Sequence, residues 1–322
     1  MKKVITMLLL IFTLTACLSE ELAYEYEDQQ LSNGDINELY EGAVYDEIIK
    51  HEDIEYGENI SQGGEKVKLL MDIYEPKESI EEKRPLVIFA YGGGFITGEK
   101  EYMADECRFF AEAGYVAASI NYRLVDSHIE RENDIAKRAM IDAVHDMKAA
   151  IRYFNKDVAE ENLYRIDSKN IFASGHSAGA FTSLHAAYLD QEDLINWDEK
   201  ELVEYIENMG GLEGTSGNAG YASDIRGVLN MSGGLLDLNL IQEGEAVLFS
   251  VHGTDDDVVP YKKGESDGSG VEIYGSYLIH QVAEGKVNNL LWTIEGGGHD
   301  PYEITEEWMY SMRSFVKSNL IQ

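Results

Sequence analysis

The sequence predicts an α/β protein with a mostly parallel central sheet flanked by helices, and two patterns carry this prediction. The first is a series of apolar runs, four to eight residues long and mostly without polar alternation, as in strands buried on both faces of a parallel sheet. The second is a set of longer helix-like segments between them, of which 134–155 is the clearest. The predicted strands are 67–74, 86–90, 116–121, 171–174, 228–231, 247–251 and 290–294.

The charge balance is strongly acidic. There are 26 Lys and Arg residues against 60 Asp and Glu residues, which gives a formal net charge of -34. Because nucleic-acid binding requires clusters of basic residues to displace counterions from phosphates, this composition argues against a nucleic-acid partner. Such a surface also repels itself, and salt screens that repulsion. We therefore expect adaptation to a saline habitat, with a merely acidic exported protein as the alternative.

Residues 1–17 have the features of an export signal. Lys2 and Lys3 form a basic start, and the apolar run 4–14 is too short to span a bilayer comfortably. The run ends in Leu-Thr-Ala-Cys, which resembles the bacterial lipoprotein cleavage box. The resemblance implies that Cys17 becomes the lipidated first residue of an extracytoplasmic protein, anchored to the bacterial cell membrane by its lipid alone. An ordinary signal peptide with an incidental cysteine is the alternative.

The rest of the chain divides into an acidic tether and one large domain. Residues 18–45 are rich in Asp and Glu and poor in branched apolar residues, which predicts a flexible tether. Residues 46–322 form the predicted domain. Within it, 190–226 fits the strand and helix alternation poorly, so we expect an insertion that covers the site as a lid, or else a plain surface excursion. Cys107 is the only other cysteine, and we expect it to be buried without a disulfide partner.

Two segments match the pattern Gly-x-Ser-x-Gly, which is typical of a nucleophilic serine on a tight strand-to-helix turn. The segment 175–179 follows the predicted strand 171–174 and precedes small residues and a helix-like stretch, so Ser177 is the predicted nucleophile. The segment 264–268 lies in a polar, glycine-rich stretch that is predicted to be a flexible loop, with no predicted buried strand before it and no predicted helix directly after it. Ser266 is therefore predicted to be a chance match.

A serine hydroxyl needs a base to become a nucleophile, and the base needs a carboxylate to orient it. Among the eight histidines, His299 is the best candidate because it follows a predicted strand and three glycines near the end of the domain. The carboxylate is expected in the run 255–257, which follows the strand 247–251, and the residues alone leave the three aspartates open. A metal site is the competing interpretation of this run, but its spacing matches no calcium loop.

The transition state of acyl transfer also needs backbone N–H donors for the developing oxyanion. The glycines at 92–94 follow the strand 86–90 and lie well before Ser177, where such a donor loop belongs. A phosphate-binding loop is the alternative for three glycines, but no Lys-Ser or Lys-Thr pair follows them.

These motifs together resemble the α/β-hydrolase carboxylesterases and lipases. The segments 91–98 (Tyr-Gly-Gly-Gly-Phe-Ile-Thr-Gly) and 175–180 look like the type B carboxylesterase forms, whereas 252–260 and 297–299 look like smaller single-domain esterases. The resemblance implies the α/β-hydrolase fold. It also implies the acid and the oxyanion donors, which are Asp256, Gly93, Gly94 and Ala178. Two positions depart from many relatives: Tyr91 stands where histidine is frequent, and Asp257 where proline is frequent.

Site chemistry and resemblance together predict a serine carboxylic-ester hydrolase that acts through an acyl-enzyme on small or short-chain esters. We expect no cofactor and no metal, and the oligomeric state stays open. The alternatives are a polyester depolymerase or a peptidase with the same triad. A non-catalytic surface-binding lipoprotein is less favoured, because binding alone would need neither the triad nor the glycine loop.

Overall fold

The computed structural model of the chain describes residues 39–79, 81–129, 133–267, 269–303 and 305–321. The predicted signal, Cys17 and most of the predicted tether lie outside these residues. The described end of the tether is attached to the domain: the backbone N–H groups of Tyr40, Val44 and Tyr45 donate to carbonyl oxygens of Glu112 and Ala113.

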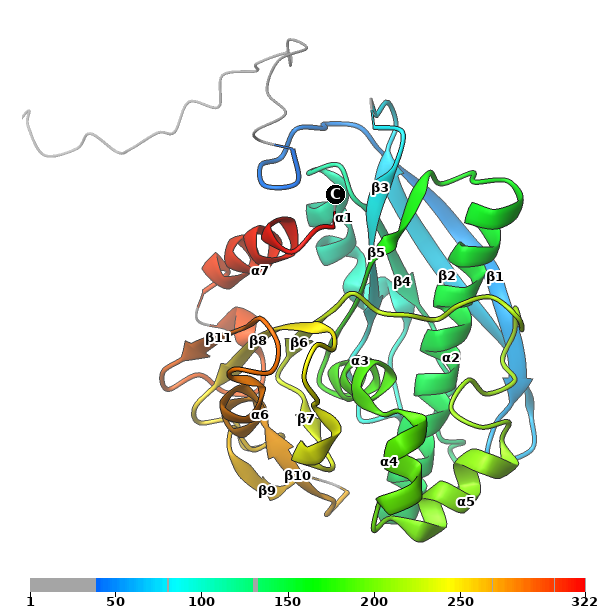
Figure 1. Ribbon diagram of the computed structural model, residues 1–322, viewed down its shortest axis with the longest axis vertical. Coiled ribbons are helices and arrows are strands. Elements are labelled where there is room, and N and C mark those ends of the chain that lie inside the picture. Colours follow the sequence, from blue (N-terminus) through cyan, green and yellow to red (C-terminus); the bar gives the residue numbers. More distant parts are fainter. Residues whose placement is uncertain (1–38, 80, 130–132, 268, 304, 322) are drawn as a thin grey trace, which may run out of the picture. The chain divides into compact units, whose positions relative to one another are not determined.

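An eight-stranded sheet forms the centre of the domain (Figure 1). Its strand order is β1-β2-β4-β3-β5-β6-β8-β11. The pairs β1–β2 and β2–β4 are antiparallel, and all other neighbours are parallel. The strands are β1 (Ile48–Ile60), β2 (Lys66–Pro76), β3 (Arg84–Ala90), β4 (Val116–Ile120), β5 (Ile166–His176), β6 (Gly227–Met231), β8 (Val247–Gly253) and β11 (Asn289–Ile294).

The mostly parallel sheet confirms the predicted fold class, and all seven predicted strands are present. Every residue of β3, β4, β6 and β8 is buried, which explains why these strands are mostly apolar and lack a regular polar alternation. The strand β1 was not predicted. It lies at the edge of the sheet, has exposed charged residues along its length and contains irregular pairing with β2, so it lacks the apolar signature of a buried strand.

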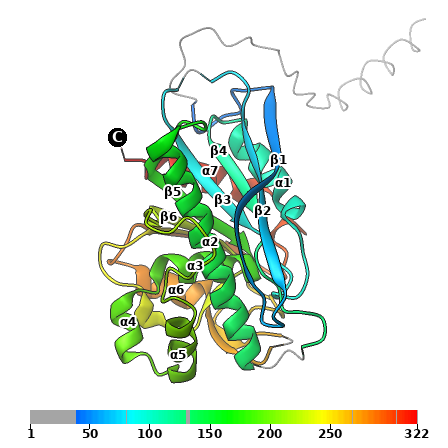
Figure 2. The ribbon, with the colours of Figure 1, turned by 90° about the vertical axis from the view of Figure 1, so that its right-hand side faces the viewer.

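Helices cover both faces of the sheet (Figures 1 and 2). On one face lie α2 (Asn133–Glu160) and α3 (Ala178–Tyr188), and α2 contains the predicted helix 134–155. On the other face, α1 (Ala104–Ala111) contacts α7 (Glu307–Ser318) through the edge-on rings of Phe109 and Tyr310, 5.3 Å apart. A further helix, α6 (Ser276–Ala283), precedes β11. Cys107 is fully buried in α1. Among the described residues, no helix combines the length and apolarity needed to cross a bilayer.

The segment 190–226 fits the plain surface excursion better than the lid. It forms α4 (Gln191–Asn196) and α5 (Lys200–Asn208), followed by a loop that leads into β6. No residue of the segment lines the main cavity, which is the one that contains Ser177 and His299. Ion pairs hold it against α2 instead, between Lys137 and Glu199 and between Arg152 and Glu213.

A small second sheet, which was not predicted, stands beside the site. It contains β7 (Gly234–Leu235), β10 (Glu272–Gly275) and β9 (Lys263–Glu265), in that order and all antiparallel. The hairpin of β9 and β10 lies between β8 and α6 in the sequence. Its residues contribute one wall of the main cavity, including Ser266, Val271 and Ile273.

Candidate active site

Ser177 lies on a sharp turn between β5 and α3. Its backbone has φ 53° and ψ −120°, a strained conformation for a residue with a side chain. The flanking glycines make the turn possible: a Cβ on Gly175 would come within 2.3 Å of the Gly179 backbone, and one on Gly179 within 2.0 Å of the Ala90 carbonyl oxygen. The turn therefore requires glycine on both sides of the serine.

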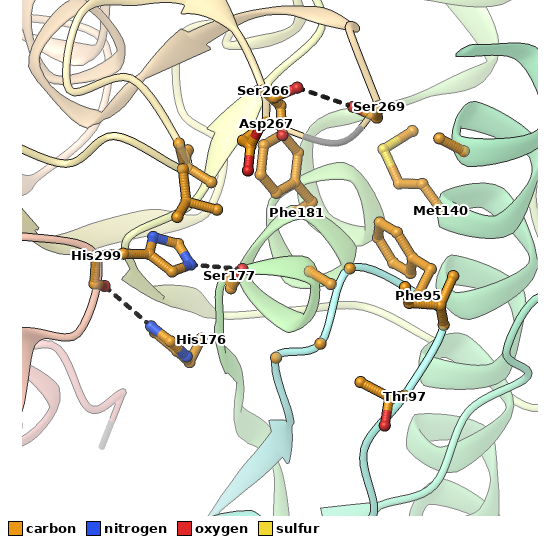
Figure 3. A pocket seen from close by; sticks show the side chains of 18 of the residues that line it. Phe95, Thr97, Met140, His176, Ser177, Phe181, Ser266, Asp267, Ser269 and His299 are labelled. Carbon is orange, nitrogen blue, oxygen red and sulfur yellow. Dashed lines mark hydrogen bonds between the residues drawn. The ribbon is translucent and has the colours of Figure 1, made fainter. Parts of the chain in front are cut away.

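His299 brings its imidazole to this serine across more than a hundred residues of sequence. Its Nε2 lies 2.8 Å from Ser177 Oγ, a hydrogen bond that Figure 3 shows at the centre of the cavity. His299 sits in the loop between β11 and α7, after the glycines 296–298. The predicted nucleophile and the predicted base are thus in direct contact.

Among the three aspartates at 255–257, Asp256 is the one whose side chain faces His299. Its Oδ2 accepts from His299 Nδ1 at 2.8 Å, while its Oδ1 accepts from the backbone N–H groups of Val258 and Val259. Burial alone would raise the pKa of this carboxyl, but contacts with two imidazoles outweigh burial and hold the pKa well below its usual range. Asp255 and Asp257 are exposed. Geometry thus selects the aspartate that sequence spacing alone left open.

This carboxylate also sets the tautomer of His299. Because Asp256 can only accept, the neutral ring carries its proton on Nδ1 and leaves Nε2 free to accept from the Ser177 hydroxyl. The three side chains therefore form one chain of hydrogen bonds in the direction that general-base catalysis requires.

The glycine loop passes beside Ser177 at the end of β3. Gly93, Gly94 and Phe95 all have positive φ, and a Cβ on Gly93 would come within 2.0 Å of the Thr97 carbonyl oxygen. Ala178 is the first residue of α3, where backbone N–H groups have no partner within the helix. All three predicted donor residues, Gly93, Gly94 and Ala178, line the cavity together with Ser177.

Tyr91, one of the two departures noted in the sequence, lies behind this loop and not in it. Its side chain is 1% exposed and stacks on Tyr122 with ring centroids 4.4 Å apart. The Tyr122 hydroxyl donates to the Tyr91 carbonyl oxygen at 2.7 Å. These contacts hold the start of the glycine loop from the interior of the protein. The outer wall of the cavity is therefore formed by residues other than Tyr91.

The cavity has a volume of about 710 Å³, within the range of sites for small organic molecules. Apolar side chains such as Phe95, Met140 and Phe181 line one part of it (Figure 3). The exposed residues Asp267 and Asp300 also border it. Within the described ranges, no group of three or more His, Cys, Asp or Glu side chains is placed to hold a metal ion.

The other serine and the neighbouring histidine have different surroundings. Ser266 lines the same cavity, but no described histidine hydrogen-bonds to its side chain. His176 turns away from Ser177, and its Nε2 bonds to the His299 carbonyl oxygen at 3.2 Å (Figure 3). Burial and the proximity of His299 lower the pKa of His176 to about 4, so this ring is neutral at physiological pH.

Sequence reasoning missed the hairpin wall and a second histidine, His252, which contacts Asp256. The hairpin is short, polar and rich in glycine, and no pattern distinguishes it from an exposed loop. His252 could have been noticed only as part of the segment 252–260, since its contact with Asp256 depends on the turn between them.

Comparison with known proteins finds a family model that matches part of the chain and solved structures with a similar fold. The family model described as BD-FAE matches residues 71–211. A truncated carbohydrate esterase from gut microbiota superimposes with a TM-score of 0.62 at 19% identity, covering 84% of this chain and 96% of that one. The apo form of Thermogutta terrifontis esterase 2 gives a TM-score of 0.59 at 20% identity, covering 83% and 94%. The chain thus has the α/β-hydrolase fold.

The curated proteins that are similar in sequence match only part of this chain and are much longer than the matched part. A probable isoprenylcysteine alpha-carbonyl methylesterase from Oryza sativa subsp. japonica is 30% identical over 154 residues, which cover 46% of this chain and 33% of that protein. A second such rice protein is 27% identical over 153 residues, covering 46% and 34%. The chain thus spans about a third of the length of the curated relatives it matches.

Proposed function

We propose that this α/β hydrolase is a serine carboxylesterase that cleaves small esters through an acyl-enzyme. The observation that carries the proposal is the unbroken chain of hydrogen bonds from Ser177 through His299 to Asp256. The names of the similar proteins, most of which are esterases, agree with it. One similar structure is that of Thermogutta terrifontis esterase 2 phosphorylated by paraoxon, 20% identical with a TM-score of 0.58.

In the proposed acylation step, Ser177 Oγ attacks the ester carbonyl carbon while His299 Nε2 takes the hydroxyl proton. Asp256 stabilises the imidazolium that results, and it stays ionised because its pKa is lowered. The backbone N–H groups of Gly93, Gly94 and Ala178 would receive the oxyanion of the tetrahedral intermediate. His299 then gives its proton to the departing alcohol.

In deacylation, a water molecule takes the place of the alcohol. His299 Nε2 removes a proton from this water as it attacks the acyl carbon, and the proton then returns to Ser177 Oγ as the carboxylic acid leaves. The same two hydrogen bonds thus serve both halves of the reaction, which is why one fixed orientation of the imidazole is sufficient.

The cavity favours a neutral ester with an apolar part. Phe95, Met140 and Phe181 offer apolar contact, whereas Asp267 and Asp300 would repel a substrate that carries its own carboxylate. The net charge of -34 acts in the same direction over a longer range. We therefore include electrical neutrality in the proposed substrate class.

A matched pair of esters tests this class. The protein should hydrolyse p-nitrophenyl butyrate with a kcat/KM at least about 10-fold above that for p-nitrophenyl hemisuccinate, and salt should narrow the difference because it screens the repulsion. A chain-length series from acetate to decanoate then measures the capacity of the apolar part. Equal rates on the charged and neutral esters would contradict neutrality, and absence of any ester hydrolysis would contradict the function.

Labelling tests the nucleophile itself. Incubation with paraoxon should inactivate the protein and add one diethylphosphoryl group to the peptide that contains Ser177, as read by mass spectrometry. The Ser266→Ala variant should be labelled to the same extent. Label on Ser266 in the parent chain, or no label at all, would contradict the assignment. A polyester depolymerase would also cleave films of an aliphatic polyester, and a peptidase would cleave peptide amides.

We also propose that the protein is held outside the cell by a lipid on Cys17, on the basis of the lipoprotein box at 14–17. Expression in a bacterial host with an alkynyl palmitate analogue should label the full-length chain and place it in the membrane fraction. The Cys17→Ala variant should be unlabelled. Equal labelling of both chains would contradict the anchor.

A further inference from the structure

Asp256 contacts a second histidine. His252, near the end of β8 and fully buried, has its Nε2 3.0 Å from Asp256 Oδ2 and 2.9 Å from the Val259 carbonyl oxygen. Asp256 Oδ2 is also the oxygen that accepts from His299. One carboxylate oxygen therefore lies between two imidazole rings, of which only His299 reaches the nucleophile.

The hydrogen bonds behind His252 determine which of its nitrogens carries a proton. The Gly233 N–H donates to Asn230 Oδ1, so the Asn230 amide group points its Nδ2 toward Ser276 Oγ at 2.9 Å. Ser276 thus accepts from Asn230, and its own hydroxyl proton is free to donate to His252 Nδ1 at 2.7 Å. His252 Nε2 faces two groups that can only accept, the Asp256 carboxylate and the Val259 carbonyl, so the proton of the neutral ring resides on Nε2.

This N–H closes a small ring of contacts around the carboxylate. The Val259 N–H holds Asp256 Oδ1, and His252 Nε2 lies against both the Val259 carbonyl oxygen and Asp256 Oδ2. A carboxylate held at Oδ1 alone could still turn its other oxygen away from His299. The proton on His252 Nε2 opposes this turn from the side away from the nucleophile.

We propose that His252 is a positioning residue that fixes Asp256 Oδ2 in line with the Nδ1–H of His299. It touches neither Ser177 nor the cavity, so it acts on the reaction only through Asp256. This inference rests on the proposed triad function. It predicts that losing the Nε2–H contact lowers turnover without weakening substrate binding, because a misaligned base affects the chemical step.

Two substitutions of similar size and polarity distinguish the contact of His252 Nε2 with Asp256 from the contact of His252 Nδ1 with Ser276. In His252→Gln, the amide nitrogen can reach the place of Nε2 and keep the contact with Asp256, while the bond to Ser276 is lost. In His252→Asn, the shorter side chain can keep an acceptor for Ser276 but cannot reach Asp256. Both variants disturb the same buried position, so they differ mainly in which partner is retained.

We expect kcat of His252→Gln within about threefold of the parent and kcat of His252→Asn lower by about 10- to 100-fold, with KM little changed in both. His145→Phe serves as a control for the loss of a buried histidine, since His145 lies on α2 and does not line the cavity. It should leave kcat unchanged. Equal loss in the Gln and Asn variants, or a change confined to KM, would overturn the proposal.

A measurement on the parent chain applies even if a variant fails to fold. Nitrogen-15 NMR of histidine-labelled protein should show His252 as the Nε2–H tautomer with a strongly hydrogen-bonded proton. The Nδ1–H tautomer at this residue would overturn the proposal. If the parent hydrolyses no ester, the proposed function fails, whereas the NMR result still decides whether His252 directs its proton at Asp256.

Discussion

The two Gly-x-Ser-x-Gly segments border the same cavity but differ in what surrounds their serine. Ser177 stands on a strained turn between a buried strand and a helix, 2.8 Å from an imidazole nitrogen. Ser266 lies in the hairpin loop after β9, where its backbone N–H bonds to Val271 across the hairpin. Both serines thus border the cavity, but only Ser177, the proposed nucleophile, has a histidine partner and a turn that presents its hydroxyl to the cavity.

The largest effect on activity is expected from removing the hydroxyl of Ser177. Ser177→Ala should lower kcat by a factor on the order of 10⁶, as expected when a member of a catalytic triad is lost. The residual rate should be read from a long incubation with p-nitrophenyl butyrate, and circular dichroism should confirm that the variant is folded. A folded variant that keeps a tenth of the activity would show that another group performs the attack.

The glycines two residues before each serine, Gly175 and Gly264, should differ in how much the stability of the protein depends on them. Gly175→Ala places a Cβ against backbone atoms 2.3 Å away, so it should lower the free energy of unfolding by about 1–3 kcal/mol or more. Gly264→Ala meets only the ring of Pro260, at 2.9 Å, and should cost less than about 1 kcal/mol. Urea unfolding measures both, and an equal cost would mean that the first turn is no more constrained than the second.

The burial of His176, the residue that precedes Ser177, should link the stability of the protein to pH. The pKa of His176 is lowered to about 4 from an ordinary value of 6.5 in the unfolded chain. Between these values the unfolded state binds more protons, so stability falls as pH drops from about 6.5 to about 4, by up to about 1.4 kcal/mol per pH unit for each such group. His185, with its pKa also lowered to about 4 by burial, acts in the same direction.

Urea unfolding at several pH values tests this linkage. His176→Gln should reduce the slope of stability against pH by the contribution of one proton, and its amide can still donate to the His299 carbonyl oxygen. Identical slopes in the parent and His176→Gln chains would argue that this ring takes up its proton in the folded state.

The smallest expected effect is that of Ser266→Ala. Because its hydroxyl has no histidine partner, kcat/KM for p-nitrophenyl butyrate should change by less than about threefold, through altered contact in the cavity and not through chemistry. Steady-state kinetics with short and long esters gives the measurement. A loss of several decades would reverse the assignment of the two motifs.

Much of the fold could be predicted from the sequence because burial leaves a direct mark on composition. Strands such as β3 and β8 are buried along their whole length and consist largely of apolar residues, with few polar ones such as Ser250 and His252. The edge strand β1 has one exposed face with charged residues, so its pattern resembles that of a loop. The segment of α4 and α5 was recognised as an interruption, but its position depends on contacts with distant parts of the chain, among them ion pairs with α2 and the burial of Leu202 and Ile206, which no local pattern encodes.

The candidate site shows the same division between local and distant information. Ser177 and the glycine loop were identifiable because each depends on a turn whose residues are adjacent in sequence. Asp256 could be selected only through resemblance to a family, since Asp255 and Asp257 have the same chemistry and nearly the same place. The role of His252 depends on contacts with β6 and α6, which the sequence separates by more than twenty residues on either side.

The hairpin of β9 and β10 supplies a cavity wall without supplying any member of the triad. In the proposed esterase, substitutions at its cavity-lining residues Ser266, Val271 and Ile273 would therefore alter which acyl or alcohol groups fit while leaving the proposed nucleophile, base and acid in place. Selection for a new substrate, in nature or in a directed library, would then have in this hairpin a segment that it can vary at small cost to the rate of bond cleavage.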